Sequence, residues 1–172
     1  EGLETAQDWN LVPHLSSNAH FAENVVGIYT SFSIDASAKT DLKVGLRYEH
    51  TTTNLGSESE PDIVDRRYGS WFPSVFVTRK LTDTRNINFS YSRRLRRPQF
   101  SWLAPWLNFS DPSTFQKGNP ALRPALTDAL KLTYAIRNVQ FSLHYSVESR
   151  ALRSVSLVDA ANDLQYNTYE NL

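Results

Sequence analysis

Cysteine is absent from the 172 residues, which excludes disulfide scaffolds, cysteine zinc sites, iron–sulfur clusters and thiol nucleophiles. Neither sign of charge is in excess, because 18 basic residues balance 18 acidic ones. This balance argues against a generally basic nucleic-acid binder, so we expect no nucleic-acid partner. Long apolar runs are missing too: the mean hydropathy is −0.45, and no run approaches the roughly 20 residues of a transmembrane helix.

The two ends lack the usual signals of a complete chain. The opening Glu1-Gly2-Leu3-Glu4 has neither a basic start nor an apolar run, and methionine is absent throughout. We therefore expect a processed or excised piece of a longer chain. Its length suits one domain better than two. The many aromatic, Ser, Thr and Asn residues are typical of β-sheet and leave open a β-barrel membrane protein.

Apolar and polar residues alternate with a period of two in several segments, which predicts strands. One example is 21–34, and another is 87–92. The clearest segment has polar residues between the apolar Val139, Phe141, Leu143, Tyr145 and Val147. No helical period lasts longer than a turn. We therefore predict an all-β chain of about six to eight strands.

The connections alternate in length along the chain. Short ones are expected at 35–41, 82–86 and 137–138, and long ones at 53–67 and 97–127. An antiparallel up-and-down meander gives this pattern when its tight turns lie at one rim and its long loops at the other. Outer-membrane barrels have this arrangement.

The two faces of the predicted strands differ in polarity. The apolar face ends in aromatic residues in several strands, as a membrane girdle would require: Tyr48, Trp71, Tyr91 and Tyr145. A half-exposed sheet over a soluble core would alternate in the same way. The loop pattern favours the first alternative, part of a transmembrane β-barrel wall, with 1–19 as a leading segment and 20–172 as the barrel fragment.

Three motifs carry a family resemblance. They are Phe89-Ser90-Tyr91-Ser92-Arg93-Arg94-Leu95-Arg96-Arg97-Pro98, then Leu103-Ala104-Pro105-Trp106, then Gly118-Asn119-Pro120-Ala121-Leu122-Arg123-Pro124. The chain resembles the barrel of TonB-dependent outer-membrane receptors. There, a strand ending in Tyr-Ser-Arg-Arg and Arg-Pro precedes a loop with a Gly-Asn-Pro-x-Leu-x-Pro signature. The likeness runs from about residue 20 to the end.

The resemblance implies an outer-membrane location and a parent that imports a scarce solute, such as a ferric chelate, a glycan or a peptide. In the family that this chain resembles, the receptor is a barrel of about two dozen strands with a plug domain inside it. Nothing in this sequence resembles a plug or a TonB-contacting segment. We therefore expect a slice of barrel wall whose partners are outer-membrane lipid, the remainder of the barrel and the plug, with TonB acting only through that absent plug.

The densest charged feature is a cluster of four arginines. Alternation places Arg94 and Arg96 on the polar, lumen side and Arg93 on the tyrosine side. Arg94 and Arg96 are candidate ligands of an anionic substrate, because guanidinium groups bind carboxylate and phosphate in a bidentate manner. The alternative, which we favour, is that the arginines pair with lumen carboxylates such as Glu49 and stabilise the wall.

The long loop adds further candidates. Trp102, Trp106, Phe109 and Phe115 could stack on sugar rings or a planar chelate, or could pack the loop against its own base; for the two tryptophans both alternatives stay open. The remaining motif residues are predicted to be structural, with a glycine that tolerates positive φ and stiffening prolines: Arg97, Pro98, Gly118, Asn119, Pro120, Leu122 and Pro124.

Signals of catalysis or of a bound metal are missing. The four histidines have no ligand spacing, the acidic stretch 58–65 fits no calcium loop, and no Gly-x-Ser-x-Gly elbow occurs. We predict no enzyme, metal or cofactor. Three rivals to the receptor remain: a soluble carbohydrate-binding β-module that uses Trp102 and Trp106, a non-transporting outer-membrane barrel for adhesion or assembly, and an enzyme, since hydrolases sometimes lack obvious motifs.

Overall fold

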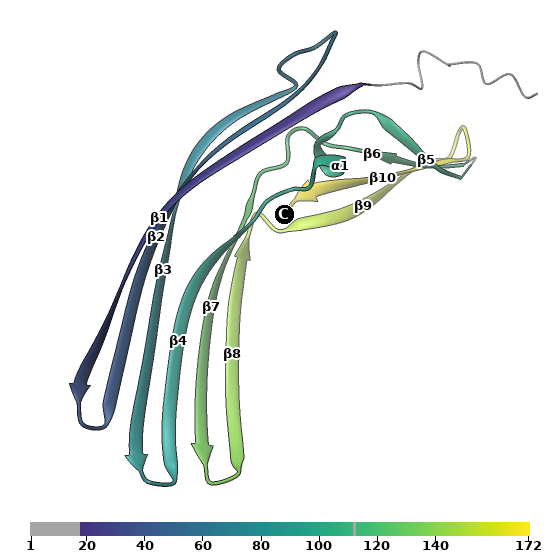
Figure 1. Ribbon diagram of the computed structural model, residues 1–172. Coiled ribbons are helices and arrows are strands. Elements are labelled where there is room, and N and C mark those ends of the chain that lie inside the picture. The colour runs from purple at the N-terminus through teal and green to yellow at the C-terminus, as the bar shows by residue number, and fades with distance from the viewer. Residues whose placement is uncertain (1–17, 112) are drawn as a thin grey trace, which may run out of the picture.

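The computed structural model describes residues 18–111 and 113–172, so most of the predicted leading segment 1–19 lies outside the described residues. Six strands form one curved sheet in the order β1-β2-β3-β4-β7-β8 (Figure 1). All neighbours are antiparallel. The strands are β1 (Ala19–Ser37), β2 (Thr40–Ser57), β3 (Val64–Thr82), β4 (Arg85–Arg96), β7 (Ala125–Ile136) and β8 (Val139–Ser149). The predicted all-β, up-and-down meander is confirmed for this sheet.

A second, smaller sheet projects from the upper end of the first (Figure 1). Its order is β5-β6-β10-β9, and β6 and β10 run parallel, which the predicted meander does not contain. The elements are α1 (Phe100–Leu103), β5 (Leu107–Asp111), β6 (Thr114–Lys117), β9 (Leu152–Asp159) and β10 (Leu164–Asn171). Within the described residues, no helix is long and apolar enough to cross a bilayer.

The register of the large sheet separates its two faces. Val77, Phe89, Leu132 and Leu143 are successive cross-strand partners, and their neighbours Thr78, Asn88, Thr133 and Ser142 form a parallel polar row. Because side chains alternate with a period of two, one register determines both faces of every strand.

The apolar face is exposed rather than folded into a core. Leu143 and Phe141 are 69% and 62% exposed, and Val44, Leu46 and Phe89 also count among the exposed large hydrophobic residues. Toward one end of this face the Tyr48 and Trp71 rings lie 4.7 Å apart. These side chains therefore do not form the sealed interior of a soluble protein.

The long connections differ from the predicted loops. The range 53–67 is mostly strand, since β2 continues to Ser57 and β3 starts at Val64, leaving only 58–63 between them. Polarity misled the prediction: the β-branched threonines before residue 54 suit a strand even when their surroundings are polar. The range 97–127 contains α1, β5, β6 and the start of β7, so the described residues 18–111 and 113–172 form ten strands instead of the six to eight expected. The short turns at 38–39, 83–84 and 137–138 match their predicted positions.

The buried core lies where the large sheet meets the long connections. Six residues form it: Leu55, Val64, Leu103, Leu122, Ala125 and Leu152. They come from the ends of β2 and β3, from α1, from the approach to β7 and from β9. The connections are therefore packed as one unit with the upper end of the wall, as long ordered loops commonly are.

Candidate functional site

Arg97 directly follows β4, and its side chain contacts residues of β1 and β2. Its Nη2 donates to Glu49 Oε2 at 2.8 Å and to Thr51 Oγ1 at 3.0 Å, and its Nε lies 3.9 Å from Glu23 Oε1. Burial alone would lower the pKa of Arg97, but hydrogen bonding to Glu49 and the other interactions raise it above its ordinary value. The predicted pairing with a lumen carboxylate is therefore made by Arg97, in keeping with a structural role.

The other three arginines of the cluster have different surroundings. Arg93 binds Asp128 through two hydrogen bonds on the apolar side. Arg96 lies 3.1 Å from Glu148 Oε1. Arg94 is exposed on the polar side, and no hydrogen bond or ion pair to its side chain is found within the described part of the chain. Of the two predicted substrate ligands, only Arg94 has an available guanidinium group.

The aromatic residues of the long loop pack against neighbours. Trp102 stacks on Tyr169 with ring centroids 4.1 Å apart, and both Trp102 and Trp106 pack against the buried core. Phe115 stacks on Tyr166 at 5.6 Å. The side chain of Phe109 lies outside the described residues. These contacts favour the packing alternative for the tryptophans, and a substrate role for any of the four stays a prediction.

The Gly-Asn-Pro motif holds the loop by close packing and by backbone hydrogen bonds. No glycine in the described ranges has a positive φ, so the predicted reason for Gly118 is wrong. A Cβ at Gly118 would overlap the carbonyl group of Ala104, which makes close approach the reason instead. The backbone N–H of Asn119 donates to the carbonyl oxygen of Trp102 at 2.6 Å, and its side-chain Nδ2 donates to the carbonyl oxygen of Tyr169 at 3.0 Å.

The rest of the motif is tied to β3. Arg66 donates from both terminal nitrogens to the carbonyl oxygens of Leu122 and Pro120, and Leu122 and Pro124 are buried. Pro98 borders a small cavity near the same residues. These contacts support a structural role for the motif, which stays a prediction.

The polar face is hollowed beside Arg94. A cavity of about 500 Å³ is bordered there by residues of β1 to β4, among them Tyr29, Arg47, Phe72 and Phe76. The guanidinium carbon of Arg47 lies 4.9 Å from the centre of the Phe72 ring, a cation–π contact. The sequence analysis missed these residues, although alternation alone places Arg47 and Phe72 on the polar face.

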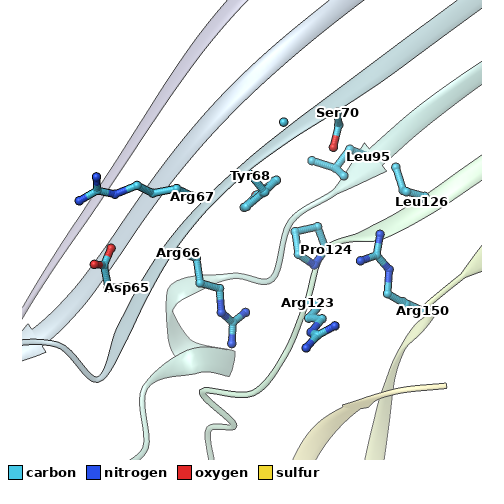
Figure 2. A pocket seen from close by; sticks show the side chains of 11 residues that line it. Asp65, Arg66, Arg67, Tyr68, Ser70, Leu95, Arg123, Pro124, Leu126 and Arg150 are labelled. Carbon is cyan, nitrogen blue, oxygen red and sulfur yellow. The ribbon is translucent and has the colours of Figure 1, made fainter.

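A second cavity of about 510 Å³ lies where β3 and β4 separate (Figure 2). Pairing of these strands ends at Ser74 and Ser92, while β3 continues upward to Val64. Arginines from distant segments border this cavity: Arg66, Arg67, Arg123 and Arg150. No sequence motif connects them. Among the described residues, no group of three or more His, Asp or Glu side chains could hold a metal ion.

Three solved structures share this fold at low sequence identity. The hemophore receptor HasR of Serratia marcescens, in complex with its hemophore HasA and heme, is 14% identical with a TM-score of 0.69 over 87% of this chain and 29% of its own. The copper transporter OprC is 12% identical with a TM-score of 0.66, over 88% and 25%. The ferric enterobactin receptor PfeA of Pseudomonas aeruginosa is 19% identical with a TM-score of 0.57, over 87% and 22%.

The chain thus spans less than a third of the length of these proteins. A comparison with curated proteins finds no match. The similarity confirms the resemblance to the barrel wall of TonB-dependent receptors at the level of the fold. The family model of the outer membrane protein beta-barrel family matches residues 1–172. With an exposed apolar face on a curved antiparallel wall, the chain belongs to this family and is located in the outer membrane.

Proposed function

We propose that the chain forms part of the barrel wall and the outer loops of a TonB-dependent receptor that imports a scarce solute, such as a ferric chelate, a glycan or a peptide. The observation that carries the proposal is the hollow on the polar face. It combines the available guanidinium group of Arg94 with the Arg47–Phe72 pair. Such a surface suits an anionic solute with a flat or ring-shaped part.

Within this proposal the candidate residues have separate tasks. Arg94 contacts the solute in the lumen, whereas Arg96 is engaged with Glu148 and supports the wall. Trp102, Trp106 and Phe115 shape the entrance, since their rings already pack against other parts of the chain. Phe109 remains a candidate for solute contact on the basis of its place in the loop.

The proposed partners follow from the surfaces of the wall. Lipid covers the apolar face. The remainder of the barrel pairs with the outer edges of β1 and β8, which are the end strands of the large sheet, because lipid offers no partner for backbone groups. A plug domain and TonB supply the gate and the energy for import. We propose no nucleic-acid partner and no enzymatic activity.

An uptake experiment tests the proposal. Cells would carry the full-length protein as the sole source of this receptor, and uptake of a labelled ferric chelate, a glycan and a peptide would be measured against cells without it. We expect one class to require the protein. Replacing Arg94 by Gln should then slow uptake at limiting solute by about tenfold, the effect of losing one charge-assisted hydrogen bond.

Arg79→Gln is the matched control, because Arg79 is exposed on β3 but belongs to the opposite face. It should leave uptake unchanged. If the protein reaches the outer membrane but no solute class depends on it, the proposal fails and the non-transporting adhesion or assembly barrel takes its place. The soluble carbohydrate-binding module does not fit an outer-membrane location.

A further inference from the structure

The cavity between β3 and β4 gathers positive charge from three separate segments. Arg66 comes from β3, Arg123 from the segment before β7, and Arg150 from the link between β8 and β9. Arg67 also borders the cavity, but in Figure 2 its side chain points away from the other three. Asp65 is the single acidic residue on the border. The cavity therefore carries a clear excess of positive charge.

One side chain holds two of these arginines in place. Asn171 Nδ2 donates to the carbonyl oxygens of Arg123 at 2.9 Å and of Arg150 at 2.8 Å. Its Oδ1 accepts the backbone N–H of Arg123 at 2.7 Å. Arg150 has a φ of 57°, a left-handed conformation that is uncommon for arginine. The Asn171 side chain thus holds the backbone of Arg123 and of Arg150 together at one cavity, although the two arginines are far apart in the sequence.

The guanidinium groups themselves differ in availability. Arg66 is engaged with the carbonyl oxygens of Leu122 and Pro120, and burial, followed by the charge of Arg123, lowers the pKa of Arg66. The exposed side chains of Arg123 and Arg150 have no hydrogen bond or ion pair within the described ranges. The cavity therefore offers a fixed positive charge beside two guanidinium groups that can bind a ligand.

We propose that this cavity binds a phosphate group. Several guanidinium forks around one hollow match the oxygen atoms of phosphate, which accept bidentate hydrogen bonds, and a volume of about 510 Å³ lies in the range of small-molecule sites. The phosphate belongs either to the headgroup of a membrane lipid or to a soluble ion. Leu95 and Leu126, which also border the cavity, give a lipid an apolar wall to follow. The proposal does not depend on solute import.

Calorimetric titration of the full-length protein in non-ionic micelles tests the proposal with two probes. Inorganic phosphate represents the soluble source. Short-chain phosphatidic acid represents the lipid source, and the corresponding diacylglycerol is its control without phosphate. Binding of phosphatidic acid but not of diacylglycerol or inorganic phosphate assigns the site to a lipid, and binding of inorganic phosphate assigns it to a soluble ion.

The variants then locate the binding. Replacing Arg123 and Arg150 together by Gln should weaken binding at least about tenfold, whereas R67Q should change it less than about twofold. R150Q alone, at an exposed side chain, provides a second test if the double variant does not fold. The proposal is overturned if neither phosphate probe binds, if R123Q/R150Q and R150Q bind as tightly as the unaltered protein, or if R67Q weakens binding as much as they do.

Discussion

Arg97 contacts Glu49 with 2.8 Å between Nη2 and Oε2, although β3 lies between β2 and β4 in the sheet. The arginine reaches over the polar face of β3 because pairing of β3 with β4 has already ended at Ser74 and Ser92. The ion pair thus bridges the place where the two strands separate. It connects the start of the long loop, at Arg97, to β2, at Glu49.

Loss of this bridge should destabilise the wall. Replacing Arg97 by Gln removes two charge-assisted hydrogen bonds from a partly buried group, so we expect the free energy of unfolding to fall by about 2 kcal/mol. Urea unfolding in detergent, followed by tryptophan fluorescence, measures the change. Arg96→Gln is the control, because its pair with Glu148 is more exposed and should contribute less than about 1 kcal/mol. Equal effects of both variants would contradict the bridging role.

Gly118 should not tolerate a methyl group. A Cβ there would overlap the backbone of Ala104, so Gly118→Ala is expected to lower the free energy of unfolding by about 1–3 kcal/mol. Gly27→Ala is the matched control, because its added Cβ would find its nearest neighbours at 3.5 and 3.6 Å, an ordinary contact. We expect a change within about 0.5 kcal/mol for the control. A stable Gly118→Ala protein would show that the loop does not pack as described.

A charge on the apolar face should be far more costly than one on the polar face. Leu143 and Ser146 lie on opposite faces of β8 and are both exposed. Leu143→Arg should destabilise the folded protein in a bilayer by about 2–4 kcal/mol, since lipid does not solvate the guanidinium group. Ser146→Arg should change the stability by less than about 1 kcal/mol. Reversible urea unfolding in lipid vesicles measures both, and the reverse order would invert the assignment of the faces.

The two ends of the wall should differ in access from outside the cell. The chain contains no cysteine, so single cysteines can be placed at Ser59, between β2 and β3, and at Ala160, between β9 and β10, and in the short turns at Asp83 and Asn138. A membrane-impermeant maleimide added to intact cells should label the first two and spare the others, because the short turns of such barrels face the periplasm. Labelling of residue 83 or 138 in intact cells would refute this topology.

The turn between β9 and β10 should depend on an ionised carboxylate. Hydrogen bonds from Asn162 and from the Ala161 backbone lower the pKa of Asp159. Because the folded pKa lies below the unfolded value, the stabilisation is complete above the ordinary aspartate range and is lost as pH falls through the lowered pKa. The protection of the Ala161 amide against hydrogen exchange, measured relative to its intrinsic exchange rate at each pH, should therefore fall in acid. In Asp159→Asn the protection should no longer change with pH in this range, and if the change persists, another group is responsible.

Several features of the fold and site were predictable from local sequence. Alternation identified the two faces of the strands at Phe89, Phe141 and Leu143. The loop signature at residues 118–124 indicated a structural role, but not that Gly118 is required by its close approach to Ala104. The strand ends near residue 54 were not predictable, because a polar threonine run looks alike in a loop and in a strand that leaves the membrane. The parallel pairing of β6 with β10 joins segments some 50 residues apart and has no local signal.

The amino-acid sequence by itself determined the all-β class, the polarity of each face, the tight turns and the family resemblance, because each depends on residues that are close together along the chain. Only the tertiary structure decided that Arg97 rather than Arg94 or Arg96 binds Glu49, and that Asn171 brings Arg123 and Arg150 to one cavity. These contacts arise where strands separate and loops fold back. The physical reason is that long-range packing selects one partner among many chemically equivalent side chains.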